Sequence, residues 1–123
     1  MLIQESGENY LETILMLGQN GKKVRSVDIA AAMDFSKPSV SIAMKKLRQD
    51  GFIEIDGGVI TLTENGKKIA ERMYERHLLL SNWLIALGVD KQVAMDDACR
   101  MEHVISEESF EAIRANIKLS SNH

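Results

Sequence analysis

The chain has 123 residues, of which 45% are hydrophobic and 27% charged, and its formal net charge is −3. This composition supports one packed domain or two small subdomains and excludes an intrinsically disordered chain. No apolar run is long enough for a membrane span, and no signal-peptide pattern is present. The single cysteine cannot form an internal disulfide. We therefore expect a cytoplasmic protein that does not bind membranes.

The N-terminal part of the chain predicts three helices. Residues 5–17 have an apolar face, and turn residues then interrupt the helix. Ser26 is a candidate N-cap for a short second helix, and Ser36 is a candidate N-cap for a third helix that Gly51 ends. Pro38 lies in the first turn of the third helix, where its missing N–H costs little.

After these helices the periodicity changes to that of strands. The segments "FIEID" and "VITLT" flank "GG" and predict a β-hairpin. Two helices joined by a short turn and followed by a hairpin outline a winged helix-turn-helix, although "MDFSK" lacks the usual turn glycine. In such a domain the third helix enters the major groove of DNA. We therefore predict a mainly α fold that begins with a winged helix-turn-helix domain.

Charge is distributed unevenly along the chain. Residues 35–49 contain four basic residues and no acidic residue, whereas residues 90–111 contain seven acidic and two basic residues. The third helix is therefore the candidate for contacting phosphates and bases of double-stranded DNA. Its candidate DNA-binding residues are Ser36, Lys37, Pro38, Ser39, Ser41, Lys45 and Arg48. Ile42 on the same helix can contact thymine methyl groups but offers no hydrogen bond to a base.

A long helix is expected from a cap at Thr63 to about Leu87. It carries two apolar stripes, one through Leu80 and one through Trp83. A surface of this width predicts burial on two sides, one against the helix's own core and one against a second copy of the chain. We therefore predict a homodimer. Two further helices are expected, over residues 91–103 and after Ser106.

The stretch "DDACRMEHVISEE" places Cys99 three residues before Glu102 and four before His103. On a helix these positions share one face, so a thiolate, a carboxylate and an imidazole form part of a coordination sphere for a transition metal. The same triple also fits a buried cysteine beside two solvated polar groups. Three helical ligands leave coordination positions empty, and the first helix offers Glu12 while the long helix offers His77.

From "ENYLETI" through "SKPSVSIAMKKL" and "RHLLL" to "DDACRMEHVIS", the chain resembles the diphtheria toxin repressor family of metal-activated transcriptional repressors. The resemblance covers nearly all of residues 5–117. It implies a homodimer with a winged helix-turn-helix DNA-binding domain over residues 1–63 and a helical metal-binding and dimerisation domain over residues 64–123, with metal held where the two meet. The sequence ends before the SH3-like third domain of longer relatives.

The resemblance implies a mixed set of metal ligands. The residues of "CRMEH" match the iron-responsive branch of the family, and His77 matches a ligand of both branches. Glu12 matches a ligand of the manganese branch, and Asn9 stands where the branches have methionine or aspartate. Ser81 and Met95 replace two ligands of the iron branch's second site, which is therefore weakened. The implied ligands are Asn9, Glu12, His77, Cys99, Glu102 and His103.

The donor chemistry leaves more than one metal open. A thiolate favours iron(II), cobalt(II) or zinc(II), whereas carboxylates, an amide oxygen and imidazoles also suit manganese(II). We expect activation by iron(II) or manganese(II), with iron(II) favoured, and binding of cobalt(II), zinc(II) or nickel(II) in vitro. Because Glu12 belongs to the DNA-binding half and Cys99 to the other half, a metal that joins them would fix the spacing of the recognition helices.

Three other functional classes share some of these features. A winged-helix regulator that responds to an organic ligand would share the fold, and its DNA affinity would not depend on a chelator. A small metal hydrolase is disfavoured because the chain has no nucleophile elbow, no phosphate-cradling glycine loop and no HExxH motif. A metal-storage or scaffold protein would not need a basic third helix. We therefore expect no enzyme and no small organic substrate, and a role in the control of metal-homeostasis genes.

Overall fold

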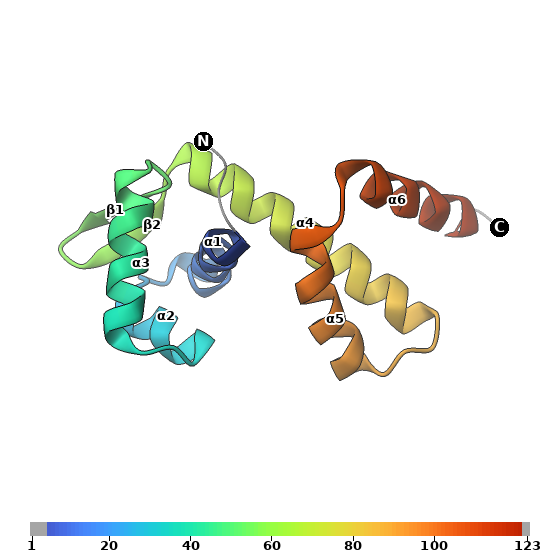
Figure 1. Ribbon diagram of the computed structural model, residues 1–123, viewed down its shortest axis with the longest axis horizontal. Helices are drawn as coiled ribbons and strands as arrows, with labels where there is room; N and C mark the ends of the chain where they lie inside the picture. The colour runs from blue at the N-terminus through green and yellow to red at the C-terminus, as the bar shows by residue number, and fades with distance from the viewer. Residues whose placement is uncertain (1–4, 122–123) are drawn as a thin grey trace. The chain divides into compact units, whose positions relative to one another are not determined.

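The computed structural model describes residues 5–121 (Figure 1). The chain forms two compact units, Met1–Arg72 and Met73–His123, and the boundary between them falls inside a long helix. In chain order the described elements are α1 (Glu5–Leu17), the 3-10 turn η1 (Gln19–Gly21), α2 (Ser26–Met33), α3 (Lys37–Gln49), β1 (Ile53–Asp56), β2 (Val59–Leu62), α4 (Glu64–Ala86), α5 (Lys91–Val104) and α6 (Glu107–Ser121). The expected assignment of DNA binding to residues 1–63 and of metal binding and dimerisation to residues 64–123 stays a prediction.

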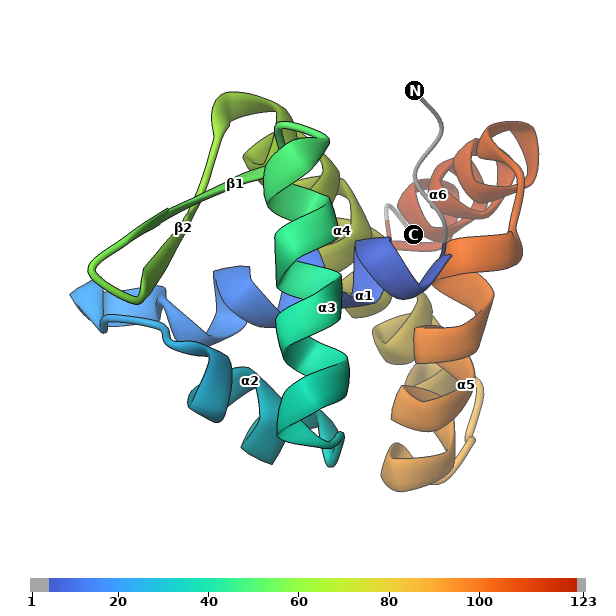
Figure 2. The same ribbon diagram turned by 60° about the vertical axis from the view of Figure 1, so that its left-hand side comes forward.

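The first unit is a helical domain with a hairpin. Figure 2 shows α3 running past α1 and α2, with the β1–β2 hairpin following from the end of α3. Apolar side chains of all these elements form one core, because each helix turns one apolar face inward. Its fully buried members include Leu11, Ile29, Val40, Met44 and Ile53. The mainly α fold and the winged helix-turn-helix predicted from the sequence are therefore confirmed.

The turn between α2 and α3 works without the usual glycine. Asp34 adopts the left-handed conformation, with φ 56° and ψ 44°, and donates its backbone N–H to the carbonyl oxygen of Ala30. Aspartate is one of the few L-residues that visits this region at modest cost. Ser36 then caps α3, its Oγ accepting the backbone N–H of Ser39 at 3.3 Å. Asp34 thus takes the place of the missing turn glycine.

The predicted cap of α2 is wrong by one residue. Ser26 is the first residue of the helix, and Arg25 before it is the N-cap, with an extended backbone. The Arg25 backbone N–H donates to the Asp28 carboxylate at 2.9 Å. The acceptor is therefore a side chain of the first turn, whereas in a serine cap the side chain of the N-cap residue accepts a backbone N–H of the first turn. The Arg25 guanidinium also donates to the carbonyl oxygen of Gly57 at 3.1 Å, so it fastens the tip of the hairpin.

The hairpin turn uses two glycines with positive φ. Gly57 and Gly58 have φ of 58° and 81°, which is typical of the type I′ turn that suits the twist of two antiparallel strands. The register pairs Asp56 with Val59 and Ile53 with Leu62. Ile53 and Ile60 on its inner face are buried in the core of the first unit. The wing is therefore attached to the helices by its apolar face.

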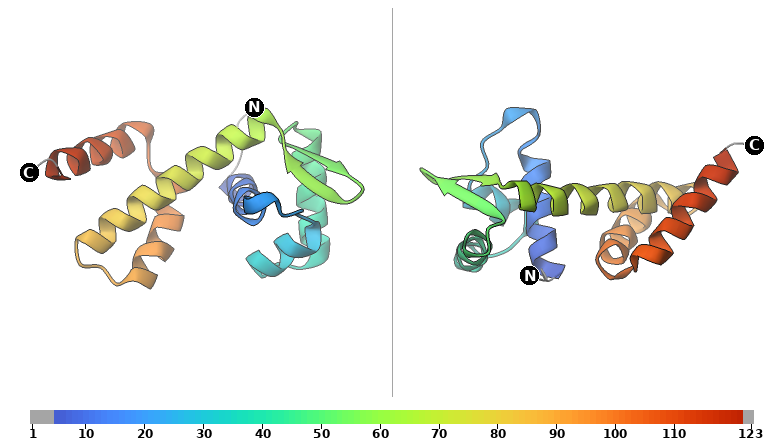
Figure 3. Two further views of the ribbon diagram at one scale, coloured as in Figure 1. Left: turned by 180° about the vertical axis from the view of Figure 1, so that it is seen from behind. Right: turned by 90° about the horizontal axis from the view of Figure 1, so that it is seen from above.

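The second unit contains the rest of α4, α5 and α6. Figure 3 shows α5 turning back after the end of α4, with α6 following after a further turn. Leu80, Ala98 and Phe110, one from each helix, form its buried centre. Asp90 caps α5 and Ser106 caps α6, each accepting backbone N–H groups of the first turn. No described helix has the length and apolar character needed to cross a membrane.

Candidate metal centre and DNA-facing helix

One face of α5 brings together three side chains that could bind a metal, as the sequence spacing predicted. The candidate ligand atoms of Cys99, Glu102 and His103 all lie within 4.8 Å of one another. Glu102 is fully buried, the His103 side chain is 1% exposed and Cys99 is half-buried. The bland alternative of two solvated polar groups beside a cysteine is excluded, because the carboxylate and the imidazole are not in water.

His77 of α4 faces the same carboxylate from the other side. Its Nδ1 lies 3.2 Å from Oε2 of Glu102, and Nε2 of His103 lies 3.3 Å from Oε1. Glu102 therefore stands between two imidazoles. The second unit thus assembles four of the six predicted ligands, three from α5 and one from α4.

The buried carboxylate points to a cation at this position. Neither oxygen of Glu102 has a hydrogen-bond partner among the described residues, although both atoms are inaccessible to solvent. An unpaired buried carboxylate costs several kcal/mol, on the order of the penalty for any uncompensated buried charge. A proton on one imidazole would provide a hydrogen bond to only one of the two Glu102 oxygens. A divalent cation among these donors would compensate both.

The distances between the donor atoms also fit a metal. Metal–nitrogen and metal–oxygen bonds of about 2.0–2.2 Å place neighbouring ligand atoms about 3.0–3.4 Å apart in octahedral or tetrahedral geometry. The nitrogen–oxygen separations of 3.2 and 3.3 Å around Glu102 lie in this range. Thiolate, carboxylate and imidazole are all ligands of divalent transition metals. The residues present therefore fit the metal that the sequence implies.

The electrostatics of His77 follow from its neighbour. The close polar contact with the Glu102 carboxylate raises the pKa of His77; partial burial lowers it, and the negative charge of Glu102 adds to the increase. The carboxylate therefore attracts positive charge to this position, whether the charge is a proton on the imidazole or a cation bound to it.

The remaining predicted ligands lie in the other unit. Asn9 and Glu12 are three residues apart on α1, so they share one edge of that helix. Their role as metal ligands stays a prediction that rests on the sequence.

The third helix presents its predicted DNA-binding residues to solvent. Val40, Met44 and Leu47 are buried along one face of α3 and attach it to the core. All the predicted DNA-binding residues are exposed: Ser36, Lys37, Pro38, Ser39, Ser41, Lys45 and Arg48. Ile42, 73% exposed, lies among them. An exposed apolar side chain on a polar, acid-free helix face is suited to the edge of a base pair.

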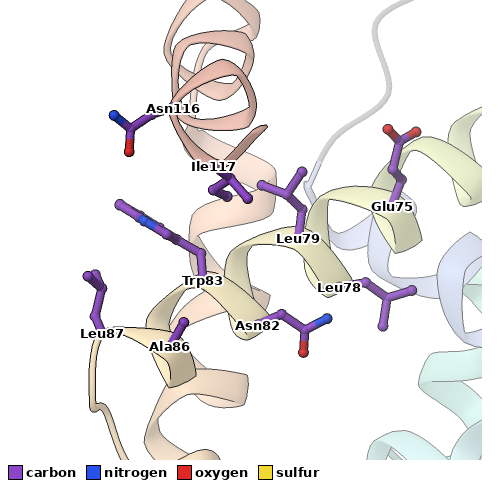
Figure 4. Close-up of a pocket in the computed structure, with 9 residues that line it drawn as sticks. All are labelled: Glu75, Leu78, Leu79, Asn82, Trp83, Ala86, Leu87, Asn116 and Ile117. Atoms are coloured by element: carbon purple, nitrogen blue, oxygen red, sulfur yellow. The ribbon is translucent and has the colours of Figure 1, made fainter. Parts of the chain in front are cut away.

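The second unit also has an apolar groove between α4 and α6. Leu79 and Trp83 of α4 and Ile117 of α6 line a space of about 700 Å³ (Figure 4). Leu78 and Leu87, which also line this groove, are exposed by 42% and 65%. Exposed apolar area of this kind marks a surface that another chain covers.

Sequence reasoning missed one residue of this unit, Arg76. Its side chain is only 8% exposed and donates hydrogen bonds to α5 and α6. A signal was present, because Arg76 lies three residues after Met73 and four before Leu80, in the inward-facing stripe of α4. A charged residue at such a position must find buried partners.

Fold and site together define the class, a winged helix-turn-helix regulator with a metal centre. Comparison with known families agrees: the iron dependent repressor N-terminal DNA binding domain matches residues 2–58. The iron dependent repressor metal binding and dimerisation domain matches residues 63–119. The chain belongs to the diphtheria toxin repressor family of metal-dependent, DNA-binding transcriptional repressors.

Several relatives resemble the chain over most of its length. It is 39% identical over 108 residues to the transcriptional regulator MntR of Escherichia coli O157:H7, which covers 87% of this chain and 70% of the relative. An uncharacterised HTH-type transcriptional regulator of Methanocaldococcus jannaschii is 30% identical over 115 residues, covering 91% of this chain and 92% of the relative. The solved structure of a manganese-dependent transcriptional repressor in complex with manganese superimposes with a TM-score of 0.83 at 29% identity. That match covers 91% of this chain, which spans about half (52%) of the longer repressor.

We expect manganese(II) or cobalt(II) to raise the melting temperature of the protein, because a cation that binds only the folded state stabilises it by about 2.7 kcal/mol at a hundredfold excess over Kd. His103→Ala should abolish this shift. Asp97→Ala is the matched control, since Asp97 lies on the same helix but is half-exposed and paired with Arg100. Thermal unfolding followed by circular dichroism measures both. If metal raised the melting temperature of His103→Ala as much as that of the wild type, the metal would bind elsewhere.

Proposed function

We propose that this chain is a metal-activated repressor that binds operator DNA as a homodimer and controls genes of metal homeostasis. One observation supports this most strongly. The buried carboxylate of Glu102 lies between His77 and His103 with no hydrogen bond to either oxygen from the described residues, and α3 of the same chain has an exposed, acid-free basic face. The proposal places the protein in the cytoplasm, with the DNA, and includes neither catalysis nor a small organic substrate.

Metal binding and DNA binding are coupled in this proposal. If bound metal raises the affinity for operator DNA, then bound DNA raises the affinity for metal by the same factor, typically worth about 1–3 kcal/mol. Two features of the chain favour such coupling. The formal charge of −3 opposes DNA binding by the protein alone, and the excess of acidic residues is concentrated in 90–111, around the proposed centre. Bound divalent cations offset part of that charge.

The preference for iron(II) expected from Cys99 is not supported by the relatives. A matched structure is a manganese-dependent repressor, and a second is a manganese regulator of 27% identity. We propose manganese(II) as the activating metal, with iron(II) as the competitor that the Cys99 thiolate favours. Glu102 and the two imidazoles bind either metal, so Cys99 is the ligand through which this chain distinguishes them.

We propose that the exposed apolar face of the second unit forms the dimer interface. The matched family domain is one of dimerisation, and it covers the whole of this unit up to residue 119. Leu78 and Ile85 are seven residues apart on α4, so they lie on one face, and both are exposed. Covering them with the same face of a second copy would give a two-fold symmetric interface. This supports the homodimer predicted from the width of the apolar stripes.

DNA binding should require a divalent metal. Fluorescence anisotropy of a labelled operator fragment, titrated with protein in the presence of manganese(II) and again with excess chelator, measures the dependence. We expect affinity to fall at least about fivefold on chelation, the lower end of typical coupling. Sedimentation velocity under both conditions is the control for dimer dissociation. Equal affinity with and without chelator would favour a regulator that responds to an organic ligand.

The basic residues of α3 should contact phosphates. Replacing Lys37, Lys45 or Arg48 by alanine should weaken binding to all DNA sequences alike and lower the slope of log K against log salt by about 0.9 for each lost contact. Lys91→Ala is the control, because Lys91 is exposed on α5 outside the DNA-binding unit. If alanine at all three positions together left the salt slope unchanged, another element would face the DNA.

Cys99 should tune which metal activates the protein. A thiolate is the soft ligand of the set, so Cys99→Glu should shift activation of DNA binding toward manganese(II) and away from cobalt(II). Cys99→Ala is the control that removes the thiolate without adding an oxygen ligand. Anisotropy titrations with each metal give the ratio of activation constants. If Cys99→Glu left this ratio unchanged, Cys99 would not be a ligand.

A further inference from the structure

The buried guanidinium of Arg76 makes three contacts that the ligand set does not explain. It donates to the backbone carbonyl oxygen of Glu102 at 3.0 Å and to that of Ile105 at 3.1 Å. It also donates to the Glu107 carboxylate at 2.8 Å. Arg76 precedes His77 on α4, so one turn of α4 carries both a proposed ligand and this arginine.

These acceptors occupy one short segment, the end of α5 and the start of α6. The last carbonyl groups of a helix have no partner within the helix, and the Glu102 carbonyl is one of them. An arginine can serve several such acceptors at once because its five N–H groups diverge from a rigid plane. Arg76 therefore fixes the position of the last turn of α5, which carries Glu102 and His103, relative to α4, which carries His77.

A second arginine provides a contrast within the same unit. The guanidinium carbons of Arg76 and Arg114 lie 5.1 and 5.0 Å from the centre of the Phe110 ring. Arg114 forms ion pairs with Glu75 of α4 and Glu111 of α6, and its described contacts lie within these two helices. Arg76 thus joins α4 to α6 through Phe110 and Glu107, whereas Arg114, which is itself on α6, joins the two helices through Glu75. The contacts of Arg76 also extend to the backbone of Glu102, a proposed metal ligand.

We propose that Arg76 is a positioning residue of the metal centre, holding the last turn of α5 so that Glu102 and His103 face His77. The inference rests on the proposed function, because it assumes that these side chains bind a metal. Arg76 does not touch the metal in this proposal. It acts through the Glu102 carbonyl, as outer hydrogen bonds act on the ligands that they orient.

Cobalt(II) is the probe, since its visible absorption reports coordination geometry as well as binding. Arg76→Lys keeps the charge and most of the length but cannot serve three divergent acceptors. We expect its cobalt dissociation constant to rise about tenfold and that of Arg76→Met by up to about a hundredfold, with altered absorption bands in both. Arg114→Met is the matched control and should keep the wild-type affinity and spectrum, although it also loses a contact with Phe110.

The outcomes separate the inference from the function on which it rests. Wild-type affinity and spectrum in both Arg76 variants would overturn the inference and leave the proposed function intact. Equal weakening by Arg114→Met would also overturn it, because attachment of α6 would then explain the loss. If Arg76→Lys lost helix content by circular dichroism, Arg76 would be a purely structural residue and the inference would be wrong. If the wild-type protein bound no cobalt(II), both the inference and the proposed function would be wrong.

Discussion

The second unit depends on the burial of one carboxylate between two imidazoles. Glu102 has no access to water, and its two oxygens face His77 and His103 at 3.2 and 3.3 Å. A charge in this position destabilises the fold unless a cation joins it, so metal binding and the stability of the unit are linked. In the proposed function this link would make the unit a sensor, because occupancy of the site would change the free energy of the structure around it.

The two units differ in which side chains they bury and which they expose, and these differences match the functions proposed for them. In the first unit, α3 buries Val40 and Met44 and leaves its cations in solvent, ready for phosphates. In the second unit Glu102 and His103 of α5 are turned inward, and Leu78 and Ile85 are exposed on α4. A basic helix face, an inward metal cluster and an outward apolar face are suited respectively to DNA, a cation and a second copy of the chain.

The ligand types alone do not determine which metal activates the protein. The thiolate of Cys99 favours softer metals, and on that basis iron(II) is favoured over manganese(II) as the metal expected from the sequence. Relatives and matched structures favour manganese instead. The thiolate is therefore one contribution to metal preference among several, because the number of oxygen ligands, the geometry and the metal available in the cell also contribute. In the proposed site, Asn9 and Glu12 would supply the further oxygen ligands on which a preference for manganese depends.

The sequence by itself determined the features that repeat over a few residues. Helix periodicity placed Cys99 on one face with Glu102 and His103 and separated the buried and exposed faces of α3. The change to strand periodicity around two glycines located the hairpin. Tertiary structure alone decided the rest, because it brings distant residues together. Asp34 adopts a backbone that the usual glycine would have signalled. The contact of His77 with Glu102 depends on how α4 packs against α5, and Arg76 meets its acceptors 26 to 31 residues away. Periodicity within a helix says which face is inside, but only packing decides what that face meets.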